Sequence, residues 1–278
     1  MTQRDTAQSA HNSIQLQYYE TRKREANHRI MVNSTPYIIN QLDKLIDVGG
    51  IEPGDRVLDV GCGMGKYTLP LAERGVDVEG LELSGKLLEE LQAQTKDRTE
   101  IRTHQADLLS PPPELMGKFD HVIGFFVLHH LFDLKQAFAS CARMLKPGGK
   151  VLFLEPNPYC PLFYLQITLS PTMSWKAEHG ILKLTPGRTK RVLEEAGLSS
   201  PNLHRFGILP PFLRNRSGGA TVENAFDRTR YRGRNHQSLH CRAKHRRYFA
   251  GSRAEFSFIY AREGFNRGHS QSCYCILG

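Results

Sequence analysis

The chain has 278 residues, 40% of them hydrophobic and 23% charged, and it carries a formal net charge of +9. This composition is ordinary for a globular protein with a substantial core, and it excludes disorder over the whole length. No apolar stretch is long enough to span a bilayer, the first ten residues lack the apolar core of a signal peptide, and the six cysteines form no pair of CxxC motifs. We therefore expect a cytoplasmic protein with reduced thiols, without a membrane span and without a metal site.

The order of the predicted elements indicates the fold class. Residues 14–47 carry apolar side chains at three- and four-residue spacing, which predicts helices. Helical segments follow the first, second and fourth of the predicted strands, and a further helix runs from Thr185 to Gly197. The strands are predicted over residues 57–60, 76–82, 101–106, 122–126 and 151–154. This alternation is typical of an α/β fold, a Rossmann-like three-layer sandwich whose mainly parallel sheet has helices on both faces.

The distribution of charge divides the chain into three regions. Residues 1–50 are expected to form an N-terminal helical cap, and residues 51–216 to form the α/β domain. Residues 217–278 hold 11 of the 37 Lys and Arg but only 4 of the 28 Asp and Glu, so the net positive charge is concentrated there. Most of this range has no helix or strand period, which predicts a basic, poorly packed or disordered tail. In residues 254–264, apolar and polar side chains alternate as in a strand. Whether this segment forms a last antiparallel strand of the sheet is left open by the sequence.

Acids and glycines follow the predicted strands at the edge where ligands bind in such folds. The first strand ends at Asp59 and is followed by alternating glycines at Gly61, Gly63 and Gly65. The other strand ends contribute Glu82, Asp107 and the run from Phe125 to His130. Because the carboxyl ends of parallel strands meet at one edge of a sheet, we expect these residues to form one ligand site.

Two common ligands of glycine-rich loops fit this pattern poorly. A phosphate-binding P-loop needs glycine where Val60 stands and Ser or Thr where Tyr67 stands. A dinucleotide fingerprint needs a small residue at the position of Lys66, and Asp59 would repel a pyrophosphate. A nicotinamide oxidoreductase is therefore disfavoured.

S-adenosylmethionine fits better because it is cationic at the sulfonium and ammonium and has no phosphate. Backbone N–H groups of the glycine loop can approach its carboxylate, while Asp59 lies near its cationic end. Glu82 can accept hydrogen bonds from the ribose hydroxyls, and Asp107 can accept a hydrogen bond from the adenine amine. The sequence therefore predicts S-adenosyl-L-methionine as the cofactor.

Five segments carry a family resemblance: "VLDVGCGMG", "VEGLELS", "QADLL", "FDHVIGFFVLHHL" and "LKPGGKVLFLEP". In this order and spacing, over about residues 50–210, the chain resembles a class I S-adenosylmethionine-dependent methyltransferase of the small-molecule type. The resemblance implies a seven-stranded sheet and methyl transfer. It also implies how the cofactor is held. Gly61 and Gly63 would contact its methionine moiety, and the backbone of Phe125 would meet the methionine amine. Glu82 would bind the ribose, and Asp107 and Leu108 would contact the adenine.

His129 and His130 are candidate catalytic bases, because they follow the fourth strand near the expected methyl group and imidazole titrates near neutral pH. His179 is a similar candidate for the pocket. Packing or loop hydrogen bonds are the alternative for all three. Tyr18 and Tyr19 either close an N-terminal helix over the cofactor or pack in the core.

The expected acceptor is a small molecule. An NPPY motif after the fourth strand would indicate amino-group methylation of nucleic acid, and the chain has "FFVLHHL" there instead. Residues 160–171 are apolar and form either a wall for an apolar acceptor or a lid on the core. Two alternatives stay open, a non-catalytic methyltransferase-like binding module and a methyltransferase that reaches RNA through its basic tail, although nucleic acid is not the expected partner. The methylated atom and the oligomeric state are not determined by the sequence.

Overall fold

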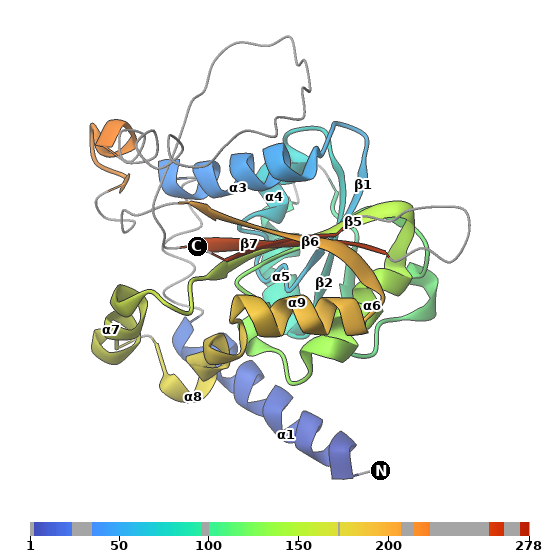
Figure 1. Ribbon diagram of the computed structural model, residues 1–278, viewed down its shortest axis with the longest axis horizontal. Coiled ribbons are helices and arrows are strands. Elements are labelled where there is room, and N and C mark those ends of the chain that lie inside the picture. Colours follow the sequence, from blue (N-terminus) through green and yellow to red (C-terminus); the bar gives the residue numbers. More distant parts are fainter. Residues whose placement is uncertain are drawn as a thin grey trace.

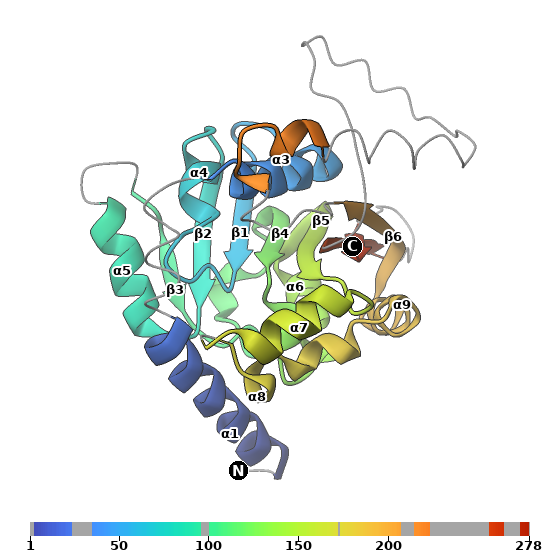
Figure 2. The same ribbon diagram turned by 90° about the vertical axis from the view of Figure 1, so that its left-hand side faces the viewer.

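A twisted sheet crosses the molecule between two layers of helices (Figures 1 and 2), and this is the three-layer α/β sandwich that the alternation predicts. The computed structural model describes residues 3–23, 35–95, 100–171, 173–206, 214–222, 256–263 and 273–277. The strands are β1 (Arg56–Val60), β2 (Asp77–Glu82), β3 (Thr103–Gln105), β4 (Phe119–Phe125), β5 (Leu145–Pro156), β6 (Leu198–Phe206), β7 (Phe256–Glu263) and β8 (Cys273–Leu277). Their order across the sheet is β3-β2-β1-β4-β5-β8-β7-β6.

In the part of the chain that the structure describes, the sheet has eight strands, whereas the family resemblance implied seven. Strand β8 pairs parallel to β5, and β7 runs antiparallel to β5, β6 and β8. The open prediction of an antiparallel strand at residues 254–264 is therefore confirmed by β7. The five residues of β8 gave no signal of their own, because so short a run has too few residues to show a period.

Strands β7 and β8 both come from the range predicted to be a poorly packed or disordered tail, and that prediction is wrong for these two segments. Their backbones are paired within the sheet. Of the rest of residues 217–278, the structure describes only residues 217–222. The basic run of residues 228–247 lies outside the described residues, and the domain boundary after residue 216 stays a prediction.

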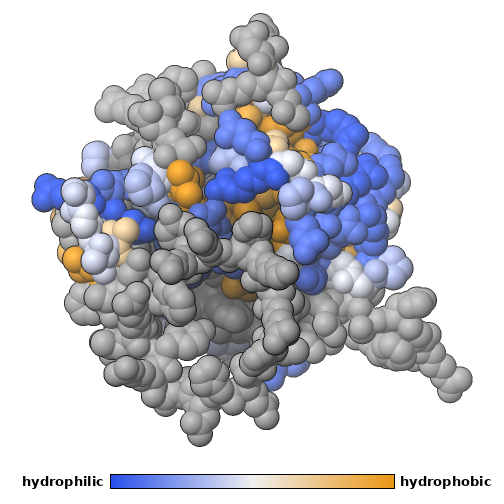
Figure 3. All heavy atoms as spheres, turned by 90° about the horizontal axis from the view of Figure 1, so that it is seen from above, coloured by the Kyte–Doolittle hydropathy of each residue, from blue (hydrophilic) through white to orange (hydrophobic). Residues whose placement is uncertain are grey.

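Helices cover both faces of the sheet. Helices α3 (Pro36–Gly49) and α4 (Thr68–Ala72) lie on one face, and α6 (Leu134–Met144) and α9 (Pro186–Glu195) lie on the other (Figure 1). Neighbouring strand residues alternate between the two core layers: Val57 packs with α3, and Leu58 packs with α6. Because both faces are covered, the strands read as continuous apolar runs. The described surface on the α3 side is mainly hydrophilic (Figure 3).

The remaining helices lie largely around the ligand edge of the sheet. They are α1 (Gln3–Tyr18), the π-helical turn η1 (Tyr19–Lys23), α5 (Gly85–Thr95), α7 (Pro161–Leu169), α8 (Trp175–Glu178) and the 3-10 turns η2 (Pro113–Leu115), η3 (Leu128–His130) and η4 (His179–Lys183). Strands β1 and β2 point toward α1 and α8 (Figure 2). At the start of helix α5, Ser84 Oγ accepts the N–H of Leu87 at 3.3 Å. None of the described helices is both long and apolar enough to cross a membrane.

Candidate functional site

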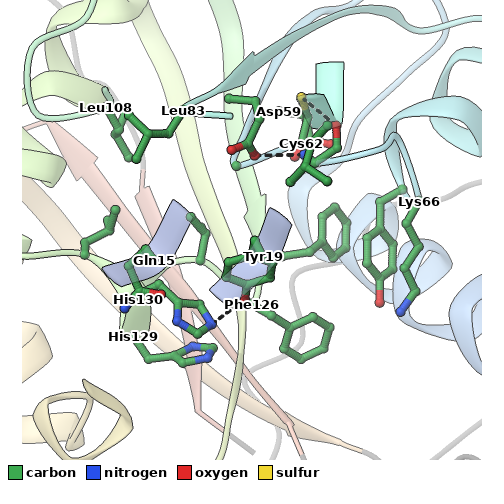
Figure 4. Close-up of a pocket in the computed structure, with 18 of the residues that line it drawn as sticks. Gln15, Tyr19, Asp59, Cys62, Lys66, Leu83, Leu108, Phe126, His129 and His130 are labelled. Carbon is green, nitrogen blue, oxygen red and sulfur yellow. Dashed lines mark hydrogen bonds between the residues drawn. The ribbon is translucent and has the colours of Figure 1, made fainter. Parts of the chain in front are cut away.

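A cavity of about 370 Å³ lies at the carboxyl ends of β1, β2 and β4. Residues from α1, the glycine loop, η3 and α7 complete its wall (Figure 4). Most of the sequence-predicted site residues line it together: Asp59, Gly61, Gly63, Glu82, Asp107, Leu108, Phe125, His129 and His130. Gly65 and His179 are not among the lining residues.

The three glycines of the loop all have left-handed backbones but serve different purposes. A Cβ at Gly61 would lie 2.5 Å from Val127 Cγ2, and one at Gly65 would lie 2.3 Å from Leu91 Cδ1. At Gly63 a Cβ would meet no atom of the described residues within 4 Å, although the φ angle is +54°. Gly65 therefore lets the loop pack against α5, whereas Gly63 leaves open space in the cavity.

Glu82 ties the glycine loop to the end of β2. Its Oε2 accepts the N–H of Gly63 at 3.0 Å, and its Oε1 accepts the N–H of Ser84 at 2.9 Å. Burial raises the pKa of this carboxyl above its usual range, and the backbone donors oppose that shift. The N–H of Leu83 is a third backbone donor, and a carboxylate with three donors keeps one lone-pair site, so Glu82 can still accept a hydroxyl group of a ligand.

Asp59 is almost fully buried at the end of β1, with 2% of its surface exposed. Burial raises its pKa to about 7, against the opposing effect of a 2.7 Å hydrogen bond from Thr68 Oγ1. A cation in the cavity would stabilise the ionised form. Asp59 is therefore suited to a positively charged ligand.

Asp107 holds the N-terminal helix against the sheet edge. Its Oδ2 accepts the side-chain amides of Gln8 and Asn12, each at 2.7 Å, and its Oδ1 accepts the N–H of Leu109 at 2.8 Å. Neither amide residue is predicted as a site residue from the sequence. They are polar residues on a polar helix, and nothing in the pattern of α1 indicates that this face is covered.

Aromatic side chains form the wall next to the glycine loop. The ring of Phe125 stacks on Tyr67 with 3.8 Å between centroids, and the Tyr67 hydroxyl donates to Gln41 Oε1 at 2.5 Å. Phe126 has a φ of +57°, the one positive value among the described residues other than glycine. A phenylalanine held in this conformation at a strand end is typical of a functional site.

His129 is clamped between two buried carboxylates. Its Nδ1 lies 2.5 Å from Glu155 Oε2, and its Nε2 lies 3.2 Å from Glu178 Oε2. Burial alone would lower the pKa of the ring, but the two carboxylates outweigh it and raise the pKa to about 9. An imidazolium that donates from both nitrogens has no lone pair for a proton. The contacts of His129 are therefore those of a buried cation and not those of a general base.

His130 has the contacts that a base needs. Its Nδ1 faces the carbonyl of Ala177 at 3.2 Å and so carries the proton. Its Nε2 is then the acceptor for the Tyr19 hydroxyl, 2.6 Å away (Figure 4). Burial and the charge of Glu178 raise the pKa of Tyr19 well above its usual value, so this phenol stays neutral and donates. Tyr19 thus lies over the cavity, and its neighbour Tyr18 donates to Glu178.

The residue that reaches the cavity from α8 is Glu178, not the predicted His179. His179 is exposed, and its Nδ1 contacts the carbonyl of Lys176 at 3.1 Å. Glu178 is buried at the helix end, where no sequence signal separates it from its neighbour. Glu155, by contrast, ends the fifth strand, so the rule that pointed to Glu82 also points to it.

His129, His130 and Glu178 offer ligand atoms within 4.8 Å of one another, which is a spacing that a metal ion can also use. His129 has hydrogen bonds at both ring nitrogens, and His130 Nε2 accepts the Tyr19 hydroxyl. An ion would have to displace contacts that the protein already makes.

Residues 160–171 fit both predicted roles in part. Phe163 and Gln166 of α7 line the cavity, together with Met173 beyond the helix, while Ile167 is buried in the core. Leu169 on the same helix is 72% exposed. One end of the cavity therefore has an apolar wall, to which Phe126 also contributes.

The sequence profile of the family described as "Methyltransferase domain" matches residues 58–153. A ubiquinone biosynthesis O-methyltransferase from Pseudomonas fluorescens (strain Pf0-1) is 30% identical over 143 residues, which are 50% of this chain and 60% of the relative. The enzyme of the same name from Dechloromonas aromatica (strain RCB) is 34% identical over 133 residues, 46% of this chain and 55% of the relative. The chain thus spans little more than half the length of these relatives.

Solved structures share the fold. A putative methyltransferase (BH2331) from Bacillus halodurans has a TM-score of 0.52 at 17% identity, covering 79% of this chain and 96% of that one. A Haemonchus contortus phosphoethanolamine N-methyltransferase 2 in complex with S-adenosyl-L-methionine has a TM-score of 0.50 at 21% identity. The match covers 69% of this chain and 42% of that one. At this identity the likeness concerns the fold alone. Together, the profile match over residues 58–153 and the curated O-methyltransferase relatives support a class I S-adenosylmethionine-dependent methyltransferase.

Proposed function

We propose that the chain binds S-adenosyl-L-methionine in the cavity and transfers its methyl group to a small-molecule acceptor. The observation that carries the proposal is that Asp59, Glu82 and Asp107 line one cavity together with the open backbone at Gly63. Three acids around one ligand suit a cation without phosphates. A hydrogen bond between a charged group and the ligand contributes about 1.5–3 kcal/mol.

The cofactor would lie along the strand ends in the order that the family pattern implies. Its methionine moiety would meet Gly61, Gly63 and the backbone of Phe125. Its ribose would meet the Glu82 carboxylate, and its adenine would lie beside Asp107 and Leu108. The sulfonium supplies an already activated methyl group, so the residues of the chain have mainly to bind and orient the two reactants.

The acceptor in this proposal is apolar and reacts through a hydroxyl group. The curated relatives are named O-methyltransferases, which supports oxygen as the nucleophile. The wall with Phe126, Phe163 and Met173 supports an apolar body for the acceptor.

His130 is the residue that can take the hydroxyl proton, at Nε2, once the Tyr19 hydroxyl gives up its place or relays the proton. The methyl carbon forms a bond to the acceptor oxygen as its bond to sulfur breaks, and the electron pair of that bond stays on sulfur. Alignment of the two reactants contributes about 7–11 kcal/mol to such a displacement. His129 assists by holding η3 in place.

The substitution Gly63→Arg tests the cofactor site, because its side chain would extend into the open space at this position. Gly54→Arg is the matched control: Gly54 also has a left-handed φ (+91°) and open space around it, but it lies before β1, at the opposite end of that strand. We expect calorimetry to show S-adenosyl-L-methionine binding lost in Gly63→Arg and kept in Gly54→Arg. Tighter binding of NAD than of S-adenosyl-L-methionine to the unchanged protein would overturn the proposal.

Turnover separates the proposal from its two alternatives. A panel of hydroxylated aromatic acceptors should include substrates whose methylation is lost in His130→Ala. Cofactor binding without turnover on any of them would favour the non-catalytic binding module. Methylation of RNA in preference to the panel would favour an enzyme that acts on nucleic acid.

A further inference from the structure

Two imidazole rings lie against each other at the cavity, with centroids 3.9 Å apart. They belong to His129 and His130, which are neighbours on η3 (Figure 4). His129 is held as a cation between Glu155 and Glu178. A proton taken up at His130 Nε2 sets a second positive charge beside the first, and like charges at this distance repel each other. For His130 to act as a base, a negative charge must offset that repulsion.

Glu178 places a carboxylate against both rings. Its Oε2 lies 3.2 Å from His129 Nε2 and 3.9 Å from His130 Nε2. Its Oε1 accepts the hydroxyl of Tyr18 at 2.7 Å, which holds the carboxylate in this orientation. Because 2% of Glu178 is exposed, water screens its charge little, and its attraction for a positive charge is stronger here than at the protein surface.

The charges around the two rings do not cancel while His130 is neutral. The carboxylates of Glu155 and Glu178 contribute two negative charges, and the imidazolium of His129 contributes one positive charge. One negative charge is therefore left over, and a proton on His130 brings the sum to zero. Since a buried charge without a partner is costly, this arrangement favours the protonated form of His130.

The other groups around the His130 ring add no charge to it. Tyr19 donates to Nε2, and burial raises the pKa of this phenol well above its usual value, so it stays neutral. On the side of α8, Nδ1 meets the backbone carbonyl of Ala177. His11 of α1 contacts the backbone carbonyl of His130 and not its ring. Glu178 is thus the acid that faces Nε2.

We propose that Glu178 is a positioning residue for proton transfer, whose carboxylate offsets the positive charge that forms on His130. Nε2 takes the proton of the acceptor hydroxyl while the oxygen forms its bond to the methyl carbon and the bond from that carbon to sulfur breaks. The electron pair of the broken bond stays on sulfur, so the sulfonium becomes a neutral thioether as His130 becomes an imidazolium. This inference rests on the proposed function, since it requires His130 as the base.

The variant Glu178→Gln tests the inference, because the amide keeps the size of the side chain and an oxygen for the N–H of His129 but removes the charge. Glu79→Gln is the matched control: Glu79 is also 2% exposed and has an imidazole partner, His104, at 2.8 Å, but it does not line the cavity. The rate of methylation of an acceptor identified in the panel would be followed from pH 5 to 9. We expect Glu178→Gln to lower kcat at pH 8 about tenfold and to move the acidic limb of the profile about one pH unit lower. Glu79→Gln should change neither.

Nuclear magnetic resonance of the histidine-labelled, ligand-free protein gives a readout that does not depend on turnover. Without the carboxylate the imidazolium is less stable, so the ring of His130 should lose its proton at a lower pH in Glu178→Gln than in the unchanged protein. An unmoved titration of the ring, or a lower kcat with an unmoved acidic limb, would overturn the inference. If the unchanged protein did not bind S-adenosyl-L-methionine, or if His130→Ala kept full turnover, the proposed function itself would fail. Should Glu178→Gln not fold, Glu178→Asp withdraws the charge by one methylene, and a smaller shift of the same sign is expected.

Discussion

Two titratable residues at the ligand edge of the sheet are both buried, yet burial favours the neutral form of one while the other stays charged. Among the described residues, Thr68 is the one donor to Asp59, and burial keeps much of the Asp59 carboxyl neutral below pH 7. His129 has a carboxylate at each nitrogen and stays charged up to about pH 9. The difference lies in the partners, because opposite charges at both ends of a ring outweigh its desolvation.

Binding of S-adenosyl-L-methionine should therefore depend on pH through Asp59. A cation in the cavity favours the ionised carboxylate and lowers its pKa, so binding releases a proton wherever the free site is protonated. We expect affinity to be level above pH 7 and to fall by up to about tenfold per pH unit below it. Calorimetry between pH 5.5 and 8 measures this slope. Asp59→Asn should bind more weakly at pH 8 and show a shallower dependence, and an unchanged slope would show that another group titrates.

At the scale of elements, the ligand edge is held by contacts among short helices and turns. Glu155 Oε1 accepts the N–H groups of Val127 and Leu128, at 2.8 and 2.7 Å, and so fixes the start of η3 after β4. Glu178 at the end of α8 joins His129 of η3 to Tyr18 of α1. The position of His130 therefore depends on three elements that are far apart in sequence.

Gly180 allows η4 to pack directly on η3. A Cβ at this position would lie 1.8 Å from the backbone oxygen of His129, a contact that requires the two turns to separate. We expect Gly180→Ala to lower the free energy of unfolding by about 1–3 kcal/mol, measured by urea denaturation, and to weaken the clamp on His129. Gly187→Ala is the control, since no atom lies within 4 Å of its Cβ position and alanine favours the helix. Equal stability of the two variants would contradict the packing argument.

At the scale of the whole molecule, the last two strands complete the sheet. Strand β8 lies against β5, and β6 has β7 as its neighbour in the described sheet. Strand β5 is long and largely buried, so its outer edge needs a partner.

Truncation after Arg216 removes both strands and leaves the edges of β5 and β6 open. We expect a lower thermal midpoint and self-association, measured by circular dichroism and light scattering. Ending the chain after residue 264 keeps β7 and should give an intermediate loss. A midpoint equal to that of the full chain would show that β7 and β8 add nothing to stability.

The sequence by itself determined the α/β class, the strand ends and nine residues that meet in the cavity, because apolar periodicity and acids after strands are local patterns. It did not distinguish Gly65 from Gly63, or Glu178 from His179, since which neighbour faces the cavity depends on how distant elements pack. Gln8 and Asn12 carry no signal in a polar helix.

The tertiary structure alone decided that β8 joins the sheet, that His129 lies between two carboxylates and that His130 Nε2 faces the Tyr19 hydroxyl. Each of these outcomes follows from partners that lie far away in the chain. A hydrogen bond or ion pair of that kind acts through distance in space, which residue spacing does not record.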